Sequence, residues 1–244
     1  MAVSKTSALP ELTGGFGGFN EEAFAFLKKL AKNNRREWFL PRKALFEEQL
    51  QKPMAQLLYA IERELAKKKL PLAANPKSVL FRIYRDIRFS EDKSPYHTHV
   101  SGSLSRNGKK NTPGMLYVHV AEKEQFAGIG FWQPERPALT NWRLRMQAEP
   151  KKFLDIVKQL KRHGLELSNT YSLKRMPRGF EALDKSPLAD FLRLQSFAVI
   201  RPITKGEVLS PDLPVQIARF ALAAKPLLDY GWALPEAKPP VLID

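Results

Sequence analysis

Helical periodicity dominates the first third of the chain. Apolar residues from Ala23 to Ala31 recur at the spacing of one helix face, and Asn20 stands where a helix-capping residue belongs. A second helix is predicted from about Pro41, and Pro53 either kinks that helix or opens a third one. We therefore expect amphipathic helices up to the stop at Pro71.

The middle of the chain changes to a period of two, which is typical of strands. From Val79 to Phe89 apolar and charged residues alternate, which predicts a strand. Three more strands follow at short intervals, separated by turn-forming residues, at His97–Leu104, Leu116–Val120 and Phe126–Trp132. Together these segments predict an antiparallel meander.

Helical patterns return after the meander. Pro137 and Pro150 stand near the starts of two predicted helices, and residues 165–173 predict a short strand or a hairpin arm. A further strand is expected at Phe197–Arg201, between two helices that begin at Ser186-Pro187 and Ser210-Pro211.

This order of elements predicts an α+β fold, with a central antiparallel β-meander packed against helices from the N- and C-terminal thirds. We expect one domain over residues 19–231, preceded by a flexible lead-in at 1–18 and followed by a Pro-rich irregular tail at 232–244.

Composition narrows the chemistry. The chain has 244 residues and no cysteine, so disulfides, thiolate metal sites and cysteine nucleophiles are excluded. Forty Lys and Arg residues against 25 Asp and Glu give a formal net charge of +15, which favours an anionic partner. The densest basic stretch runs from Arg136 to Arg178. It allows two interpretations, a surface that binds nucleic acid and a surface that only keeps the protein in solution.

The segment from Arg82 to His99, RIYRDIRFSEDKSPYHTH, concentrates the candidate chemistry. On a strand, Arg82, Asp86 and Arg88 would share one face, whereas Arg85 would fall on the apolar face. Such arginines could bind a phosphate or a carboxylate through forked hydrogen bonds. Alternatively, the motif is architectural, and Asp86 pairs with the neighbouring arginines to fix the meander.

The pattern R-I-Y-R-D-I-R-F-S-x-D-K-x-P-Y resembles the signature of an uncharacterised bacterial family, a domain of unknown function. Further matches lie at 33–39 (NNRREWF), 128–134 (GIGFWQP) and 173–180 (LKRMPRGF), so the resemblance extends over roughly residues 19–230. It implies a bacterial protein in which these residues form one domain. It implies no activity, cofactor or catalytic residue.

From the density of its charges, the motif is predicted to form a small-anion site, for phosphate or carboxylate. Its candidate ligand-binding residues are Arg82, Arg85, Asp86, Arg88, Lys93 and Tyr96. In this hypothesis the arginines stabilise the anion, Asp86 orients them, and Tyr96 donates a hydrogen bond or transfers a proton. No catalytic residue and no cofactor are predicted, and whether the protein is an enzyme stays open.

Two other sets of residues each allow two interpretations. Trp132 either forms a stacking wall beside a basic face or packs at a strand end. Lys174 and Arg175, shortly before Arg178, either complete an anion pocket or are solvated.

A metal site is not predicted. His97, His99 and His119 could share a sheet face, but the chain has four histidines in all and no cysteine to complete a ligand set. In the family that the chain resembles, lysine is common at the position of His97, which argues against a shared metal role.

No window has the length and apolar character of a membrane span, and the first residues lack the apolar core of a signal peptide. A cytoplasmic protein with no membrane partner is therefore expected. The possible partners are a small anionic ligand and, without support from any motif, nucleic acid. The sequence leaves the oligomeric state undetermined.

Overall fold

The computed structural model describes residues 15–75 and 79–234. By its contacts the chain divides into two compact units. Unit 1 comprises residues 1–127 and 201–222, and unit 2 comprises residues 128–200 and 223–244. Most of the predicted lead-in (1–14) and of the predicted tail (235–244) lies outside the described residues.

A four-stranded sheet confirms the predicted meander and the α+β class. Its strands lie in the order β1 (His99–Leu104), β2 (Met115–Ala121), β3 (Gln125–Phe131) and β4 (Phe197–Pro202). β1 and β2 pair antiparallel, with His99 opposite Ala121 and Leu104 opposite Leu116. Much of the sheet is buried on both faces, as in β1, where every residue from Val100 to Leu104 is buried.

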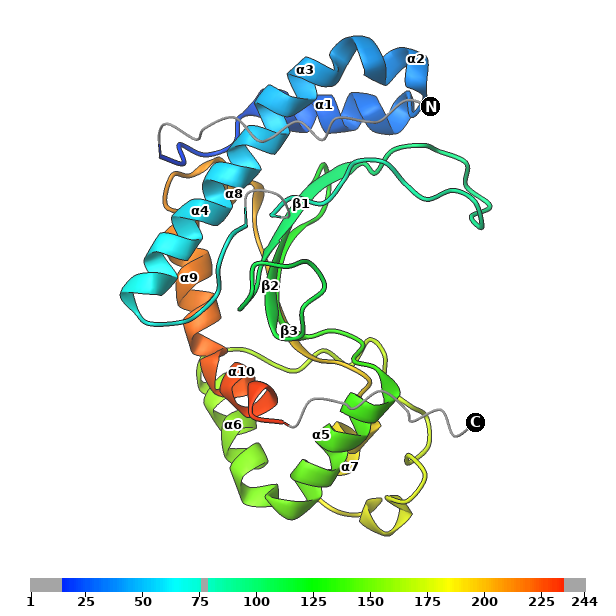
Figure 1. Ribbon diagram of the computed structural model, residues 1–244, viewed down its shortest axis with the longest axis vertical. Helices are drawn as coiled ribbons and strands as arrows, with labels where there is room; N and C mark the ends of the chain where they lie inside the picture. The colour runs from blue at the N-terminus through cyan, green and yellow to red at the C-terminus, as the bar shows by residue number, and fades with distance from the viewer. Residues whose placement is uncertain (1–14, 76–78, 235–244) are drawn as a thin grey trace. The chain divides into compact units, whose positions relative to one another are not determined.

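The strand predicted from Val79 to Phe89 is wrong. Among the described residues of this segment, pairing is limited to isolated bridges, Leu80 to Gly102 and Tyr84 to Tyr96. Between the bridges the backbone bends at Ile83, and beyond the second bridge the chain leaves the sheet as an arm of residues 84–96 (Figure 1). The alternation of apolar and charged residues therefore continues up to Phe89, although the backbone beyond Tyr84 no longer lies beside a strand with which it could pair.

The first helix of unit 1 begins where the sequence predicts, whereas the second helical run begins at Arg36, before the predicted start near Pro41. In α1 (Glu21–Lys32), the Asn20 side chain accepts a hydrogen bond of 2.9 Å from the Ala23 amide. A long helical run follows, made of α2 (Arg36–Phe39), η1 (Leu40–Arg42), α3 (Lys43–Phe46), η2 (Glu47–Gln51) and α4 (Lys52–Lys67). The predicted irregularity near Pro53 takes the form of a π-helical turn at η2, just before that proline.

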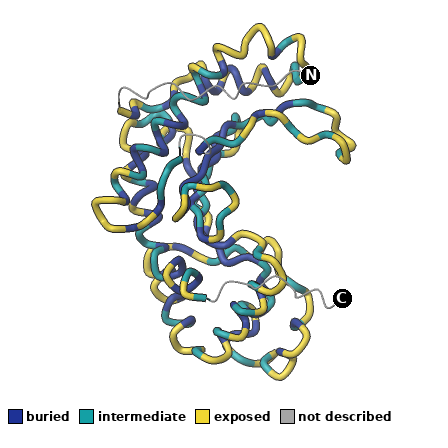
Figure 2. The backbone as a smooth tube through the Cα atoms, in the orientation of Figure 1, coloured by how far each residue is buried: buried dark blue, intermediate teal, exposed yellow. Residues whose placement is uncertain are grey.

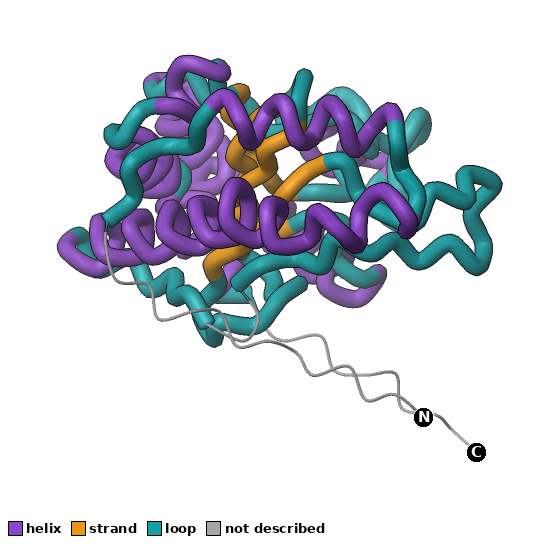
Figure 3. The backbone as a smooth tube through the Cα atoms, turned by 90° about the horizontal axis from the view of Figure 1, so that it is seen from above, coloured by secondary structure: helices purple, strands orange, loops and turns teal. Residues whose placement is uncertain are grey.

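The core of unit 1 lies between α4 and one face of the sheet. Leu57, Leu58 and Ile61 of α4 are fully buried, as are Leu104 and Val118 of the sheet. Gly102 permits this packing, because a Cβ there would lie 2.3 Å from Leu58 Cδ1 and 2.6 Å from the Val79 carbonyl oxygen. Figure 3 shows the strands beneath the long helices of this unit.

Residues 201–222 complete unit 1 with two helices. α8 (Lys205–Leu209), which the sequence analysis did not predict, begins with a capping box in which Thr204 and Glu207 bond to each other's backbone amides. α9 (Leu213–Ala223) follows, as predicted, shortly after Ser210-Pro211.

Unit 2 is built on an aromatic cluster. Its helices are α5 (Arg136–Ala148), α6 (Pro150–Arg162), η3 (Glu181–Leu183), α7 (Ala189–Arg193) and α10 (Lys225–Trp232). Trp142 stacks on Phe197 with ring centroids 4.0 Å apart, and Phe153 contacts Tyr230 at 5.6 Å. The predicted segment 165–173 forms neither a named strand nor a hairpin; it pairs through isolated bridges of Leu167 to Val199 and of Ser172 to Leu194.

Within the described residues, no helix is both long enough and apolar enough to cross a membrane.

Candidate functional site

The signature motif forms the arm of unit 1, residues 84–96. Its two sides are joined near the base by backbone hydrogen bonds from Arg85 N to Pro95 O (2.9 Å) and from His97 N to Ile83 O (2.7 Å). Its outer part is largely exposed (Figure 2), and Phe89 at the tip is 95% exposed. The motif therefore lies at an edge of unit 1, attached to β1.

Asn34 clamps the base of the arm. Its side-chain amide donates to the Tyr96 carbonyl oxygen at 2.8 Å, and its side-chain oxygen accepts from the Tyr96 amide at 3.0 Å. Asn34 thus pairs with Tyr96 as a neighbouring strand residue would. This contact joins the NNRREWF segment to the tyrosine that ends the R-I-Y-R-D-I-R-F-S-x-D-K-x-P-Y motif, 62 residues further along the chain.

Tyr96, one of the predicted ligand-binding residues, lies in the core. Its side chain is 1% exposed and its ring centroid lies 4.2 Å from that of Phe39. The hydroxyl is buried and has no hydrogen-bond partner among the described residues. Burial raises the pKa of this phenol, with smaller contributions from Tyr84 and Glu37. The Tyr96 hydroxyl is therefore poorly placed to reach a ligand.

Arg85 bonds to groups inside the arm. Its guanidinium pairs with the Asp92 carboxylate and donates to the Ser94 carbonyl oxygen at 3.2 Å. Asp92 also accepts from the Ser94 amide at 2.9 Å. Hydrogen bonds from Ser94 and then from Arg85 lower the pKa of Asp92 to about 2, so this carboxylate stays charged at neutral pH.

Arg88 and Asp86 form a second, exposed pair further along the arm. Arg88 Nε donates to Asp86 Oδ1 at 3.0 Å and Nη2 donates to Oδ2 at 2.7 Å. This forked bond lowers the pKa of Asp86 and raises that of Arg88. Nearby, Lys93 Nζ donates to the Ile87 carbonyl oxygen at 3.1 Å. The arm thus uses Arg85, Arg88 and Lys93 to hold its own shape, as the architectural interpretation expects.

Arg82 differs from the other cations of the motif. It is exposed and has neither a hydrogen bond nor an ion pair among the described residues, although its charge contributes to lowering the pKa of Asp86. Lys110, from the loop between β1 and β2, lies near it. Burial, and then the charge of Arg82, lower the pKa of Lys110.

Lys110 lies over an aromatic surface. Its Nζ is 5.2 Å from the centroid of the Phe81 ring, and Phe81 meets Tyr117 of β2 edge to face at 5.6 Å. Lys110 forms no ion pair with any carboxylate in the described parts of the chain. Arg82 and Lys110 therefore form no ion pair with a carboxylate of the described residues, although Asp86 is close enough to interact with the charge of Arg82.

The three histidines do share a sheet face, as the alternation of strand residues predicts. His99 lies 4.2 Å from His119 and 4.9 Å from His97, measured between ring centroids. His119 stacks on Phe126 at 4.8 Å. Across residues 15–75 and 79–234, no group of three side chains is arranged to hold a metal ion.

Burial keeps these imidazoles neutral. It lowers the pKa of all three, and the neighbouring rings of His119 and His97 help to bring that of His99 to about 3. Glu124 opposes the shift at His119, whereas Arg85 adds to it at His97. The cluster is thus an uncharged, half-buried part of the sheet.

Two further sets of residues singled out in the sequence lie in unit 2. Trp132 is exposed and meets Tyr171 edge to face at 5.3 Å. Lys174 and Arg175 border a hollow of about 320 Å³ that also contains Arg193, which is paired with Asp184. The structure places both sets away from the protein core.

Sequence reasoning missed Asn34 and Lys110 as parts of the site. Asn34 was identified through the match to the family signature, without a role. Lys110 stands in a loop marked by Asn107-Gly108, and no local pattern indicates that this loop lies against Phe81.

Residues 22–230 match the family model of the conserved hypothetical proteins DUF2461. The chain belongs to this family, which confirms the resemblance seen in its sequence. No curated protein and no solved structure matches the chain.

Proposed function

We propose that this family member binds a small anion, phosphate or carboxylate, beside the base of the arm. Arg82 and Lys110 would supply the positive charge. The observation that carries the proposal is that these two cations are close enough for one to lower the pKa of the other, yet neither has a carboxylate partner among the described residues.

Uncompensated like charges are costly where one of them is partly buried, because the low local dielectric strengthens their repulsion. An anion between Arg82 and Lys110 would remove that repulsion and would accept charge-assisted hydrogen bonds from both. The Phe81 ring beneath Lys110 restricts the ammonium group and favours its charged form.

The remaining predicted residues take supporting roles in this proposal. Arg85 is held by Asp92 and still adds positive potential near His97. Asp86 and Arg88 neutralise each other, and Lys93 braces the arm. Tyr96 anchors the arm to the core.

The test is a calorimetric titration of the protein with inorganic phosphate and, separately, with acetate, at low ionic strength. We expect saturable binding that Arg82→Gln and Lys110→Gln each weaken about tenfold, the size of one charge-assisted hydrogen bond. Arg63→Gln is the matched control, since Arg63 is an exposed arginine on α4 with no ion pair among the described residues. Binding that survives the Arg82→Gln, Lys110→Gln double variant would refute the site.

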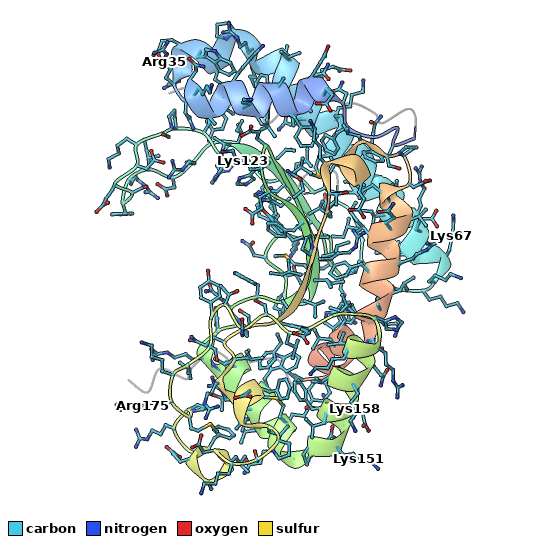
Figure 4. The ribbon with its side chains drawn as sticks, turned by 180° about the vertical axis from the view of Figure 1, so that it is seen from behind. Arg35, Lys67, Lys123, Lys151, Lys158 and Arg175 are labelled. Atoms are coloured by element: carbon cyan, nitrogen blue, oxygen red, sulfur yellow. The ribbon has the colours of Figure 1, made fainter. Side chains whose placement is uncertain are left out.

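Nucleic-acid binding by the stretch Arg136–Arg178 is the second candidate. It is favoured by exposed cations that form no ion pair with the described part of the chain, namely Arg136, Lys151, Lys161, Arg162, Lys174, Arg175 and Arg178. Against it, Arg143 and Arg145 bond to carbonyl oxygens within unit 2, and Arg175 lies on the opposite side of that unit from Lys151 and Lys158 of α6 (Figure 4). Retention on heparin that falls steeply with salt would support this candidate, and the absence of retention near physiological salt would exclude it.

A further inference from the structure

A ladder of rings crosses the sheet of unit 1 on the face opposite α4. Gly102 of β1 packs against Leu58 of α4, so His99, three positions earlier on the strand, points to the other face. The ring centroid of His119 lies 4.2 Å from that of His99 and 4.8 Å from that of Phe126, and the rings are inclined by 36° and 13°. These separations match the spacing of neighbouring strands, so one ring stands on each of β1, β2 and β3.

Two further rings connect this ladder to the cations of the proposed anion site. The Tyr117 ring centroid lies 5.9 Å from that of Phe126 and 5.6 Å from that of Phe81. Lys110 Nζ lies 5.2 Å from the Phe81 centroid, and Arg82 follows Phe81 directly in the chain. All of these residues belong to unit 1. We call the rings of Phe81, His99, Tyr117, His119 and Phe126 the ring surface.

The ring surface is uncharged, and its imidazoles keep hydrogen-bonding capacity. Burial lowers the pKa of His99 to about 3 and also lowers that of His119, so both rings are neutral at neutral pH. Within the described residues their one side-chain hydrogen bond joins His119 Nδ1 to the Tyr117 hydroxyl at 3.3 Å. A neutral imidazole carries one donor and one acceptor, so the ladder offers both to a ligand.

The chemistry of the ring surface favours a ligand that carries a planar ring as well as an anion. A free phosphate held by Arg82 and Lys110 would have no part that contacts Tyr117 or the ladder beyond it. Rings that stand on a sheet present their edges, and edge-to-face contact is a preferred arrangement between aromatic groups. A nucleobase has a large π-face for such contacts and ring nitrogens that pair with imidazole donors and acceptors.

We propose that the ligand is a nucleotide, with its phosphate at Arg82 and Lys110 and its base against Tyr117, His119 and Phe126. The cations and the rings complement the two ends of such a molecule, and the sugar bridges them above Phe81. This inference rests on the anion site proposed above, and it names the class of ligand that the site takes.

Calorimetry with adenosine 5′-monophosphate (AMP), ribose 5-phosphate and inorganic phosphate separates the contribution of the base from that of the phosphate. We expect AMP to bind about tenfold more tightly than ribose 5-phosphate. Tyr117→Leu and Phe126→Leu should each reduce this preference about threefold or more. Arg82→Gln should weaken both ligands about tenfold and leave the preference unchanged. Tyr171→Leu is the control, since Tyr171 is an exposed ring of unit 2.

The same titrations distinguish failure of this inference from failure of the anion site. Equal affinities for AMP and ribose 5-phosphate, both weakened by Arg82→Gln, would overturn the nucleotide and keep the anion site. Absence of binding of all three ligands would overturn both proposals. An oligoadenylate of about eight nucleotides that binds about a hundredfold more tightly than AMP would assign the ring surface to a single strand instead.

Histidine NMR signals locate the base in the unsubstituted protein. The chain has four histidines, and His163 lies at the end of α6 in unit 2. Saturating AMP should shift the ring C–H signals of His99 and His119, because a base next to them exerts a ring current, whereas ribose 5-phosphate should shift them much less. His163 serves as the internal control and should not respond. Equal shifts with the two ligands, or the largest shift at His163, would overturn the placement of the base.

Discussion

The Asn34 side chain pairs with both backbone polar groups of Tyr96, donating to its carbonyl oxygen at 2.8 Å and accepting from its amide at 3.0 Å. A side-chain amide carries a donor and an acceptor side by side, so it can satisfy a backbone amide and a backbone carbonyl of one residue together. Since the Tyr96 ring is packed on Phe39, the clamp sets both the position of the arm and the packing beneath it.

Asn34→Ala should destabilise the protein by about 1–3 kcal/mol, because it leaves two partly buried backbone groups of Tyr96 without partners. Urea denaturation measures the loss, and hydrogen exchange should become faster in the arm before it does in β1. Asn33→Ala is the control, since Asn33 bonds to an exposed carbonyl of its own helix. An equal loss for both variants would contradict the clamp.

Tyr96→Phe should be neutral or should stabilise the protein by up to about 1 kcal/mol. The substitution removes a buried hydroxyl that has no partner within the described residues and keeps the ring on Phe39. Thermal and urea denaturation measure the change. A loss of 2 kcal/mol or more would show that the hydroxyl has a partner, and a loss of anion binding with stability intact would restore Tyr96 to the ligand site.

The sheet and the first helix could be predicted because their signals are local. The turn-forming residues that separate the strands and the capping oxygen of Asn20 are each local signals, which depend on a few residues of the sequence. The capping box of Thr204 and Glu207 is an equally local signal, but the helix that it begins has only five residues and therefore no apolar periodicity to predict it.

The arm and the anion site depend on contacts between distant parts of the chain. Residues 79–89 have the composition of a strand, and whether they become one depends on how far β1 extends beside them. The Asp86–Arg88 pair was anticipated as one of two alternatives. By contrast, the contact of Lys110 with Phe81 depends on the path of the loop between β1 and β2, and the pattern of apolar and polar residues does not predict that path.

The histidine cluster should make the protein sensitive to acid. In the folded state the pKa of His99 is about 3, and those of His97 and His119 are also lowered, against about 6.5 in the unfolded chain. Below pH 6.5 the unfolded chain therefore binds more protons than the folded one. Stability is fully present above that pH and falls as the pH drops toward 3, by at most about 1.4 kcal/mol per pH unit for each histidine.

Urea denaturation between pH 7 and pH 4 measures this dependence. His99→Gln should flatten the curve, since it removes the group with the largest interval between its two pKa values. His163→Gln, at the end of α6 in unit 2, is the matched control outside the cluster. A pH dependence that His99→Gln does not reduce would show that carboxylates such as Asp92 dominate the acid response instead.

Two glycines of the sheet, Gly102 in unit 1 and Gly128 in unit 2, provide a matched pair that tests the packing of α4 on β1. Gly102→Ala should cost about 2–3 kcal/mol, because its Cβ would lie 2.3 Å from Leu58 Cδ1 and 2.6 Å from the Val79 carbonyl oxygen, and the carbonyl cannot move without the backbone. Gly128→Ala should change stability by less than about 1 kcal/mol, since the nearest atoms to its Cβ lie at 3.9 Å. Urea denaturation of both variants measures the difference. Because Val79 precedes the arm, Gly102→Ala should also weaken phosphate binding at Arg82, whereas Gly128→Ala should not. Similar effects of the two substitutions would contradict the close packing of α4 and Val79 on β1.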